Sequence, residues 1–378
     1  MKIERIEVFH VAMPLLAPFR TACDNTDTVE AVLVRMRAEG LEGWGEAAPW
    51  GLPAYSSEYA AGAFAVIGEF LAPRLVKQNI CSGAQLQELL APVKGNFFAK
   101  AALDLAWWDL YAQSRQEPLW RTIGGRGPVV DVGADFGVLE SIPQLLEEIG
   151  LAVAAGFKRV KLKYRPGWEL DMLAAVRRQF SNVVFHVDCN SAYRLKDLPM
   201  LRELDQYNLA MIEQPLAHDD LLDHAELRRQ VRTPVCLDES ITSAAKAEKA
   251  ARCQACDWIN IKHGRCGGLT CALEVHAACK KAGIQNWMGG MGESSVGQAF
   301  ALALATLDNC NYPSDVFPTS RFYQTDLGEP PLTLCGPSQL KALDAPGIGF
   351  KPHPGRLKQA CRQRADFGGR SGSTHHAS

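Results

Sequence analysis

Five ionisable sites recur at nearly even intervals in the middle of the chain. They are Lys161-Leu162-Lys163, Asp188, Glu213, Asp238 and Lys262. Positions 163, 188, 213 and 238 lie 25 residues apart, and Lys262 follows 24 residues later. Each site ends a short apolar run, and helix-like segments separate the runs. This pattern predicts a βα repeat with charged groups at the C-terminal ends of successive strands, where a (β/α)8 barrel assembles its active site.

Three of these sites are carboxylates that would come from consecutive strands: Asp188, Glu213 and Asp238. Hard oxygen ligands gathered in one concave site suit Mg²⁺, with the remaining positions left to water and a substrate oxygen. A single acid at a strand end usually caps the next helix or forms an ion pair. Three acids at equal spacing, flanked by lysines, favour a metal site, in which Mn²⁺ is a plausible substitute.

The lysines predict chemistry on a carbon acid. Lys161 and Lys163 have the same strand parity, so both should point into the barrel, whereas Lys262 comes from a strand on the other side of the site. Two such lysines can remove and return a proton on either face of one substrate. Desolvation and neighbouring cationic charge can lower a lysine pKa until the amine acts as a base. A divalent cation would stabilise the enolate formed when a proton α to a carboxylate leaves.

The elements around these sites support the barrel. A doubly wound sheet would need a glycine-rich loop after its first strand, but Gly264–Gly268 follows the sixth. Beyond the five runs, the expected strands are Val129–Val138 as the first, Ile284–Gly292 as the seventh and Asn311–Val316 as a weaker eighth. The expected helices include Trp168–Phe180, Asp219–Val231, Leu269–Ala282 and Ser294–Leu307.

The N-terminal part predicts a separate α+β unit. Three strands are expected at Ile3–His10, Val29–Arg37 and Gly43–Glu46, and helices at Ser56 to about Leu75 and Ala99 to about Gln116. We therefore expect the α+β domain at 1–125, the barrel at 126–325, a segment at 326–367 that packs back on the first domain, and a disordered tail at 368–378.

Composition excludes several classes of function. A formal net charge of −2 over 378 residues gives no electrostatic case for nucleic acid or an anionic membrane. No apolar run approaches the roughly 18 residues of a membrane span, and the N-terminus lacks a signal-peptide core, so we expect a cytoplasmic protein. The 12 cysteines are scattered and are expected to be buried and reduced. Cys253-x-x-Cys256 resembles half a zinc site, but the spacing to Cys266 and Cys271 does not fit one.

Together with their neighbours, the five sites resemble the enolase superfamily, in its muconate-lactonizing-enzyme subgroup. The resemblance covers about residues 1–350, including an N-terminal capping domain, and within the subgroup it is strongest to the o-succinylbenzoate synthase / N-succinylamino acid racemase group. The signature stretches are Lys161-x-Lys163, Asp188-x-Asn190, Glu213-Gln214-Pro215, Asp238-Glu239-Ser240 and Asn260-Ile261-Lys262. Supporting stretches are Pro18-Phe19-Arg20-Thr21, Gly43-Trp44-Gly45-Glu46, Tyr55-Ser56-Ser57-Glu58-Tyr59 and Gly289–Ser294.

The resemblance implies a role for each site residue. Lys163 would be the general base, with Lys161 tuning its charge. Lys262 would be the opposite-face base in a racemase, or a cation that steadies the enediolate in a synthase. The capping-domain loops Phe19–Thr28 and Ala48–Ser57 would close over the substrate. It also implies Mg²⁺ at Asp188, Glu213 and Asp238, and substrate-binding or supporting positions at Asn190, Glu239, Glu293 and Ser294.

The leading expectation for activity is o-succinylbenzoate synthase, which dehydrates 2-succinyl-6-hydroxy-2,4-cyclohexadiene-1-carboxylate for menaquinone synthesis. The alternatives are an N-succinylamino acid racemase, and then a muconate-type cycloisomerase or a dipeptide epimerase. The resemblance gives epimerases a paired Asp-x-Asp near strand eight, where this chain offers only Asp315. His263, Cys266 and Gly292 depart from the group and should change the shape of the pocket rather than the acid–base chemistry.

Two non-enzymatic interpretations remain, a barrel with surface ion pairs and a metal-dependent binding module. Both are disfavoured, and the paired lysines speak against the binding module, since a binder has no need of them. We expect a small-molecule carboxylate substrate, and at least a homodimer, because the capping-domain and barrel helices leave apolar surface that a monomer rarely exposes.

Overall fold

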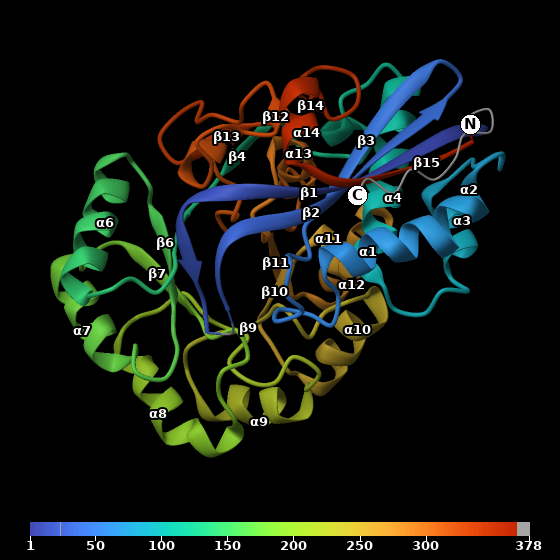
Figure 1. Ribbon diagram of the computed structural model, residues 1–378. Coiled ribbons are helices and arrows are strands. Elements are labelled where there is room, and N and C mark those ends of the chain that lie inside the picture. Colours follow the sequence, from blue (N-terminus) through green and yellow to red (C-terminus); the bar gives the residue numbers. More distant parts are fainter. Residues whose placement is uncertain (23, 369–378) are drawn as a thin grey trace.

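The computed structural model describes residues 1–22 and 24–368. A mixed α and β unit sits over one side of a parallel barrel (Figure 1). The predicted fold, a (β/α)8 TIM-like barrel with an N-terminal α+β capping domain completed by the C-terminal segment, is confirmed. The predicted disordered tail spans 368–378, and all of it after Gly368 lies outside the described residues.

The capping domain is built on a four-stranded antiparallel sheet in the order β15-β1-β2-β3. Its first two strands form a hairpin much longer than predicted, because pairing continues to Arg20 opposite Asn25 after an irregularity between Pro14 and Phe19. The expected loop at Phe19–Thr28 is therefore the tip of this hairpin. The strands are β1 (Ile3–Arg20), β2 (Asn25–Ala38), β3 (Leu41–Ala47) and β15 (Cys361–Phe367).

Helices cover one face of this sheet. Glu58 caps the N-terminus of the long helix α4 (Phe97–Ser114) from a distant part of the chain. Its carboxylate accepts hydrogen bonds from the backbone nitrogens of Phe97 and Phe98 at 2.6 and 2.9 Å. The predicted helix from Ser56 to about Leu75 starts later and contains a π-helical turn. The other segments are α1 (Ala60–Val66), η1 (Ile67–Leu71), α2 (Ala72–Leu75), α3 (Gly83–Leu90) and α5 (Leu119–Thr122).

Seven parallel strands form the barrel sheet, in the sequential order from β5 to β11. The predicted first strand, Val129–Val138, is divided. Its first part, β4 (Val129–Asp131), pairs instead with β13 (Gln339–Lys341), and only the second part joins the barrel. The barrel strands are β5 (Ala134–Phe136), β6 (Arg159–Lys163), β7 (Val184–Asp188), β8 (Ile212–Glu213), β9 (Val235–Leu237), β10 (Trp258–Ile261) and β11 (Gln285–Met288).

The predicted eighth strand, Asn311–Val316, is not a regular strand in the described chain, but it closes the barrel. Isolated parallel bridges join Cys310 to Asn286 and Ser314 to Val132. Ser314 also donates its backbone N–H to Asp131 at 3.0 Å, and Asp315 donates to Met288 at 2.8 Å. The segment therefore bonds to neighbours on both sides, although its pairing is too short to form a ladder.

The four predicted barrel helices are present, with ends within three residues of those expected: α7 (Leu170–Gln179), α9 (Leu222–Gln230), α12 (Leu269–Ala282) and α13 (Ser295–Ala305). The remaining elements are α6 (Ile142–Ala154), η2 (Leu195–Asp197), α8 (Leu198–Glu203), η3 (Leu204–Gln206), α10 (Ala244–Cys253), α11 (His263–Cys266), η4 (Thr319–Arg321), β12 (Gly328–Glu329), β14 (Lys351–Pro352) and α14 (Pro354–Ala360). Within the described residues, no helix combines the length and apolar character needed to cross a bilayer.

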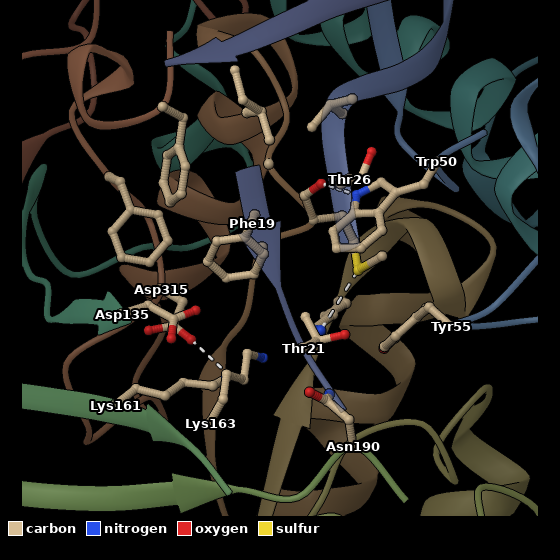
Figure 2. Close-up of a pocket in the computed structure, with 18 residues that line it drawn as sticks. Phe19, Thr21, Thr26, Trp50, Tyr55, Asp135, Lys161, Lys163, Asn190 and Asp315 are labelled. Carbon is tan, nitrogen blue, oxygen red and sulfur yellow. Dashed lines mark hydrogen bonds and ion pairs between the residues drawn. The ribbon is translucent and has the colours of Figure 1, made fainter. Parts of the chain in front are cut away.

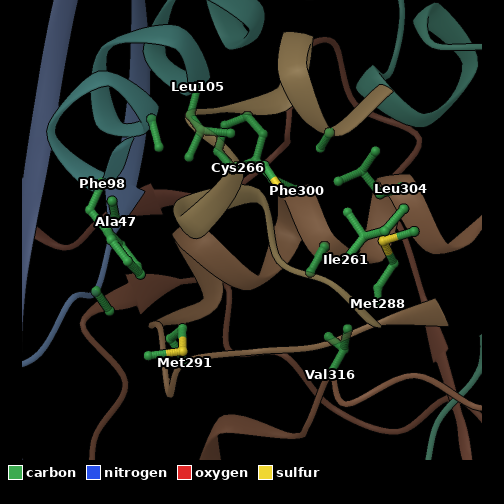
Figure 3. Close-up of a cluster of buried hydrophobic side chains, with 14 of the residues drawn as sticks. Ala47, Phe98, Leu105, Ile261, Cys266, Met288, Met291, Phe300, Leu304 and Val316 are labelled. Carbon is green, nitrogen blue, oxygen red and sulfur yellow. The ribbon is translucent and has the colours of Figure 1, made fainter. Parts of the chain in front are cut away.

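The capping domain and the barrel share one hydrophobic core. Figure 3 shows Phe98 and Leu105 of α4 in the same cluster as Ile261 of β10 and Phe300 of α13. All four side chains are at most 1% exposed. The cap is thus packed onto the strand ends as part of one continuous core, which places its loops over the site described below.

Gly45 of β3 lies where this sheet packs closely on α4, so a substitution at Gly45 tests that packing. A Cβ at Gly45 would lie 2.5 Å from the backbone nitrogen of Ala106 and closer still to the carbonyl of Ala102, and helix backbone cannot give way cheaply. We expect Gly45→Ala to lower the free energy of unfolding by about 1–3 kcal/mol or more, measured by urea denaturation. Gly127→Ala is the matched control, because nothing lies within 4 Å of the added carbon. Equal stability of the two variants would contradict this packing.

Candidate active site

The five predicted sites converge at the C-terminal ends of the barrel strands. Lys161 and Lys163 lie on β6, and Asp188 and Glu213 are the last residues of β7 and β8. Lys163 is aligned with Asp188, and Asp188 with Glu213, across neighbouring strands. Asp238 directly follows β9, and Lys262 directly follows β10. The structure therefore brings together all six residues that the sequence analysis singled out for acid–base and metal chemistry.

The three carboxylates are fully buried and each is matched by a lysine. The Lys161 Nζ lies 2.9 Å from both Asp188 Oδ2 and Glu213 Oε2. The Lys163 Nζ lies 2.7 Å from Asp188 Oδ2, and the Lys262 Nζ lies 2.9 Å from Asp238 Oδ2. In the part of the chain that the structure describes, no three His, Cys, Asp or Glu side chains gather as a metal cluster as they stand, since ammonium groups lie between the carboxylates.

The donor set nevertheless fits a divalent cation. Oε2 of Glu213 and Oδ2 of Asp238 are buried and have no hydrogen-bond partner among the described residues, although lysine ammonium groups lie at ion-pair distance. The other oxygens are fixed by neighbours, since Asn260 donates to Glu213 Oε1 at 2.7 Å and the backbone of Asn190 donates to Asp188 Oδ1 at 3.0 Å. Oriented carboxylate oxygens that lack hydrogen bonds are the ligands that Mg²⁺ prefers.

Charge pairing controls the titration of these groups. Burial alone would raise the pKa of Asp188, but the Lys161 and Lys163 charges overcome it and hold the pKa well below its usual value. Burial would lower the pKa of Lys163, but the Asp188 charge outweighs it and the pKa is raised. Lys262 behaves in the same way beside Asp238. Burial and neighbouring cations act to lower the lysine pKa, as expected, but the direct contact of each ammonium with a carboxylate outweighs both effects.

The capping domain supplies an aromatic ring to each of two lysines. The Phe19 ring, near the tip of the β1–β2 hairpin, has its centroid 5.8 Å from Lys163 Nζ. The Tyr55 ring lies 4.5 Å from Lys262 Nζ, and its hydroxyl donates to Asp238 Oδ1 at 3.1 Å. Figure 2 shows both rings at the cavity with Lys161 and Lys163. The two segments expected to close over the substrate thus reach the charged groups themselves.

The cavity between cap and barrel is mostly apolar. Its apolar walls include Leu15, Phe19, Val29, Trp50, Phe317 and Phe322. The Trp50 ring nitrogen donates to the carbonyl of Met291 at 2.7 Å, which ties the Ala48–Ser57 loop to the end of the seventh barrel unit. A substrate here would meet charge at one end and hydrophobic side chains over most of its remaining surface.

Arg159 and Arg265 are charged residues at the site that the sequence analysis missed. Arg159 is 1% exposed and lies 2.7 Å from Asp315 Oδ1, while Lys161 contacts Asp315 Oδ2 at 3.1 Å. Arg159 has the same strand parity as Lys161, so alternation could have placed it inside the barrel. Arg265 contacts Asp238 Oδ1 and the Tyr55 hydroxyl from α11, and no periodicity in the sequence indicates that contact.

The four supporting residues fall into two places. Asn190 lines the cavity, and its side chain donates to buried Glu239 at 3.4 Å. Glu293 and Ser294 are not among the residues that line it. Glu293 accepts the backbone N–H of Met291 at 2.7 Å, and the backbone N–H of Ser294 donates to Glu46 of β3 at 2.9 Å. The second pair therefore holds the loop before α13 and the contact with the cap.

Two family models match the chain and together span both units. The N-terminal domain of mandelate racemase / muconate lactonizing enzyme matches residues 3–124, and the enolase C-terminal domain-like family matches residues 144–356. The chain therefore belongs to the enolase superfamily, with the two-part organisation of the muconate-lactonizing enzymes.

Individual relatives describe the group more closely. The chain is 40% identical to an N-succinylamino acid racemase of Amycolatopsis sp, over 97% of this chain and 100% of the relative. It is also 40% identical to an o-succinylbenzoate synthase of Geobacillus kaustophilus, over 93% of each. A solved enolase-superfamily structure from Listeria innocua superposes with a TM-score of 0.92 at 35% identity, covering 97% of this chain and 99% of that one. The protein is an enzyme of the lyase and isomerase group of this superfamily.

Glu46 gives the contact between cap and α13 a pH dependence. Burial raises the pKa of Glu46 to about 7, against an unfolded value of about 4.3. Between these values the folded chain holds a proton that the unfolded chain has released, so stability falls as the pH rises through this window. We expect a loss on the order of 3 kcal/mol in urea unfolding, absent from Glu46→Gln, which has no proton to release. Exposed Glu88→Gln should follow the wild type. Parallel pH curves for wild type and Glu46→Gln would contradict the prediction.

Proposed function

We propose that this enzyme removes a proton α to a carboxylate and passes through an enediolate, with o-succinylbenzoate synthase as its leading activity. The observation that carries the proposal is the placement of Lys163 and Lys262. They extend from β6 and from the end of β10, on either side of the three strands that bear the carboxylates, and pair with Asp188 and Asp238 respectively. A substrate held at those carboxylates would have one lysine on each side.

Asp188, Glu213 and Asp238 would hold Mg²⁺, or Mn²⁺ as a substitute. When bound, this cation would supply positive charge beside the substrate carboxylate and against the oxygens that now pair with lysines. Lys161, whose pKa is raised well above its usual value by Asp188 and Glu213 against the effect of burial, stays protonated. It would add fixed positive charge where the enediolate develops negative charge.

In the synthase, Lys163 would first part from Asp188, whose charge raises its pKa, and would then take the α proton as a neutral amine, leaving the C–H electron pair in the enediolate. The carbon–oxygen bond to the hydroxyl group then breaks, and protonated Lys163 returns its proton to the departing oxygen, which releases water. Lys262 remains an ammonium group on the other face and contributes charge. The apolar walls of the cavity would limit the access of water to the reacting carbon.

N-succinylamino acid racemase is the second candidate, and the pairing of both lysines supports it. Each of Lys163 and Lys262 has its own carboxylate and its own aromatic ring, so each can transfer a proton on its own face. A dipeptide epimerase is less well supported, because Asp315 is already engaged by Arg159 and Lys161 and has no Asp-x-Asp partner. Nothing specific in the cavity favours a cycloisomerase.

Metal removal tests the carboxylate site. We expect EDTA to abolish turnover and added Mg²⁺ to restore it, because the carboxylates alone leave the developing charge unbalanced. Asp238→Asn should weaken Mg²⁺ binding, measured by calorimetry, by at least about tenfold. Asp257→Asn is a matched control. Asp257 pairs with Arg228 at a distance of 2.7 Å, and it is not among the residues that line the cavity. Full activity of metal-free protein would refute the metal requirement.

Lysine variants test the division of roles, by NMR of α-proton exchange in D₂O. In a synthase, Lys163→Ala should lose both exchange and dehydration, whereas Lys262→Arg should retain some dehydration because a cation remains. In a racemase, Lys262→Ala should still exchange one enantiomer of an N-succinylamino acid, and Lys163→Ala the other. Wild-type exchange rates in both alanine variants, on every substrate tried, would show that neither lysine is catalytic.

A further inference from the structure

One carboxylate that lines the cavity has no use in the chemistry above. Asp135 lies in the middle of β5, aligned with Lys161 on β6, and its side chain borders the cavity (Figure 2). Its Oδ1 is buried and has no hydrogen-bond partner among the described residues. Asp315 Oδ1 likewise has no hydrogen bond among the described residues, but the Asp315 carboxylate forms ion pairs with Arg159 at 2.7 Å and with Lys161 at 3.1 Å.

The guanidinium of Arg321 lies near Asp135 but binds its backbone and not its carboxylate. The guanidinium of Arg321 donates to the backbone carbonyl of Asp135 at 3.2 Å. The same guanidinium lies over the rings of Phe136 and Phe157, at 5.3 and 5.5 Å from their centroids. Burial raises the pKa of the Asp135 carboxyl, opposed by the charges of Lys163 and Lys161. An unpaired buried acceptor costs free energy, so its position at the cavity points to a donor on the ligand.

The position of Asp135 indicates which atom of the ligand this donor is. The reacting carbon must lie within reach of Lys163, with its carboxylate toward Asp188. Because β5 neighbours β6, Asp135 lies on the Lys163 side of the cavity, where a substituent of the reacting carbon would face it. In an N-acylamino acid that substituent begins with an amide nitrogen, whose N–H is a donor. A carboxylate or carbonyl oxygen in the same place would be repelled.

We propose that Asp135 accepts a hydrogen bond from the amide N–H of an N-acylamino acid and so selects α-amido acids as substrates. The assignment rests on the proposed α-proton chemistry and deepens its racemase form. Asp135 acts in binding and orientation, by fixing the rotation of the substrate about its α carbon, and takes no part in proton transfer.

The test compares two substrates that differ by one atom, N-succinyl-L-phenylalanine and the succinyl ester of L-3-phenyllactate, in which oxygen replaces N–H. The kcat/KM for α-proton exchange in D₂O is measured with Mg²⁺ for wild type, Asp135→Ala and Asp315→Asn. We expect the amide-to-ester ratio to fall about tenfold or more in Asp135→Ala, as for a hydrogen bond to a charged group. Asp315→Asn is the matched control and should keep the wild-type ratio, since Asp315 is already paired within the protein.

An unchanged ratio in Asp135→Ala overturns the proposal, including the case in which both rates fall together, because Asp135 would then act on Lys163 rather than on the substrate. If Asp135→Ala does not fold, Asp135→Asn keeps the size of the side chain and should shift the ratio in the same direction by a smaller factor. Wild-type protein that dehydrates the synthase substrate but exchanges neither phenylalanine compound overturns this assignment and leaves the proposed chemistry standing. Failure to exchange or dehydrate any of the three overturns both.

Discussion

The compensation of buried charge is the constraint on which the rest of the site depends. Asp188, Glu213 and Asp238 are fully buried, and isolated carboxylates in such a place would be protonated or would destabilise the fold. Lys161 offsets two of them at 2.9 Å, and Lys262 the third. Burial acts to raise the pKa values of Asp188 and Asp238, but positive charges provided by the barrel itself outweigh it and hold both pKa values below their usual range. The proposed metal site therefore has its carboxylates and their compensating charges in place on neighbouring barrel units.

The barrel provides the charged groups, and the cap covers two of the lysines with aromatic side chains. Phe19 and Tyr55 come from two separate cap segments, and each covers one lysine. The shared core that includes Phe98 and Phe300, together with the buried contact of Glu46 with Ser294, keeps the cap on the strand ends. A change in cap packing would thus move Phe19 and Tyr55 relative to the two lysines that they cover.

The sequence predicted the barrel and the convergence of Lys163, Asp188 and Lys262, because strand-end periodicity is a local pattern. It did not predict the lysine pKa direction, which depends on an ion pair between neighbouring strands. The eighth barrel position was predicted as a strand but is held by scattered bonds to both neighbours. Contacts such as that of Arg265 with Asp238 join different barrel units, and hydrophobic periodicity carries no information about them.

The pairing of β15 with β1 has a consequence for how the protein is made. Arg5 and Asp366, which hydrogen-bond across these strands at 2.8 Å, are 361 positions apart in the chain. A ribosome therefore releases β1 long before its edge partner exists, and the edge stays open to other strands while the barrel is synthesised. The cap sheet can be completed only after the barrel has emerged, so a truncated nascent chain would carry the lysines and carboxylates under an unfinished cover.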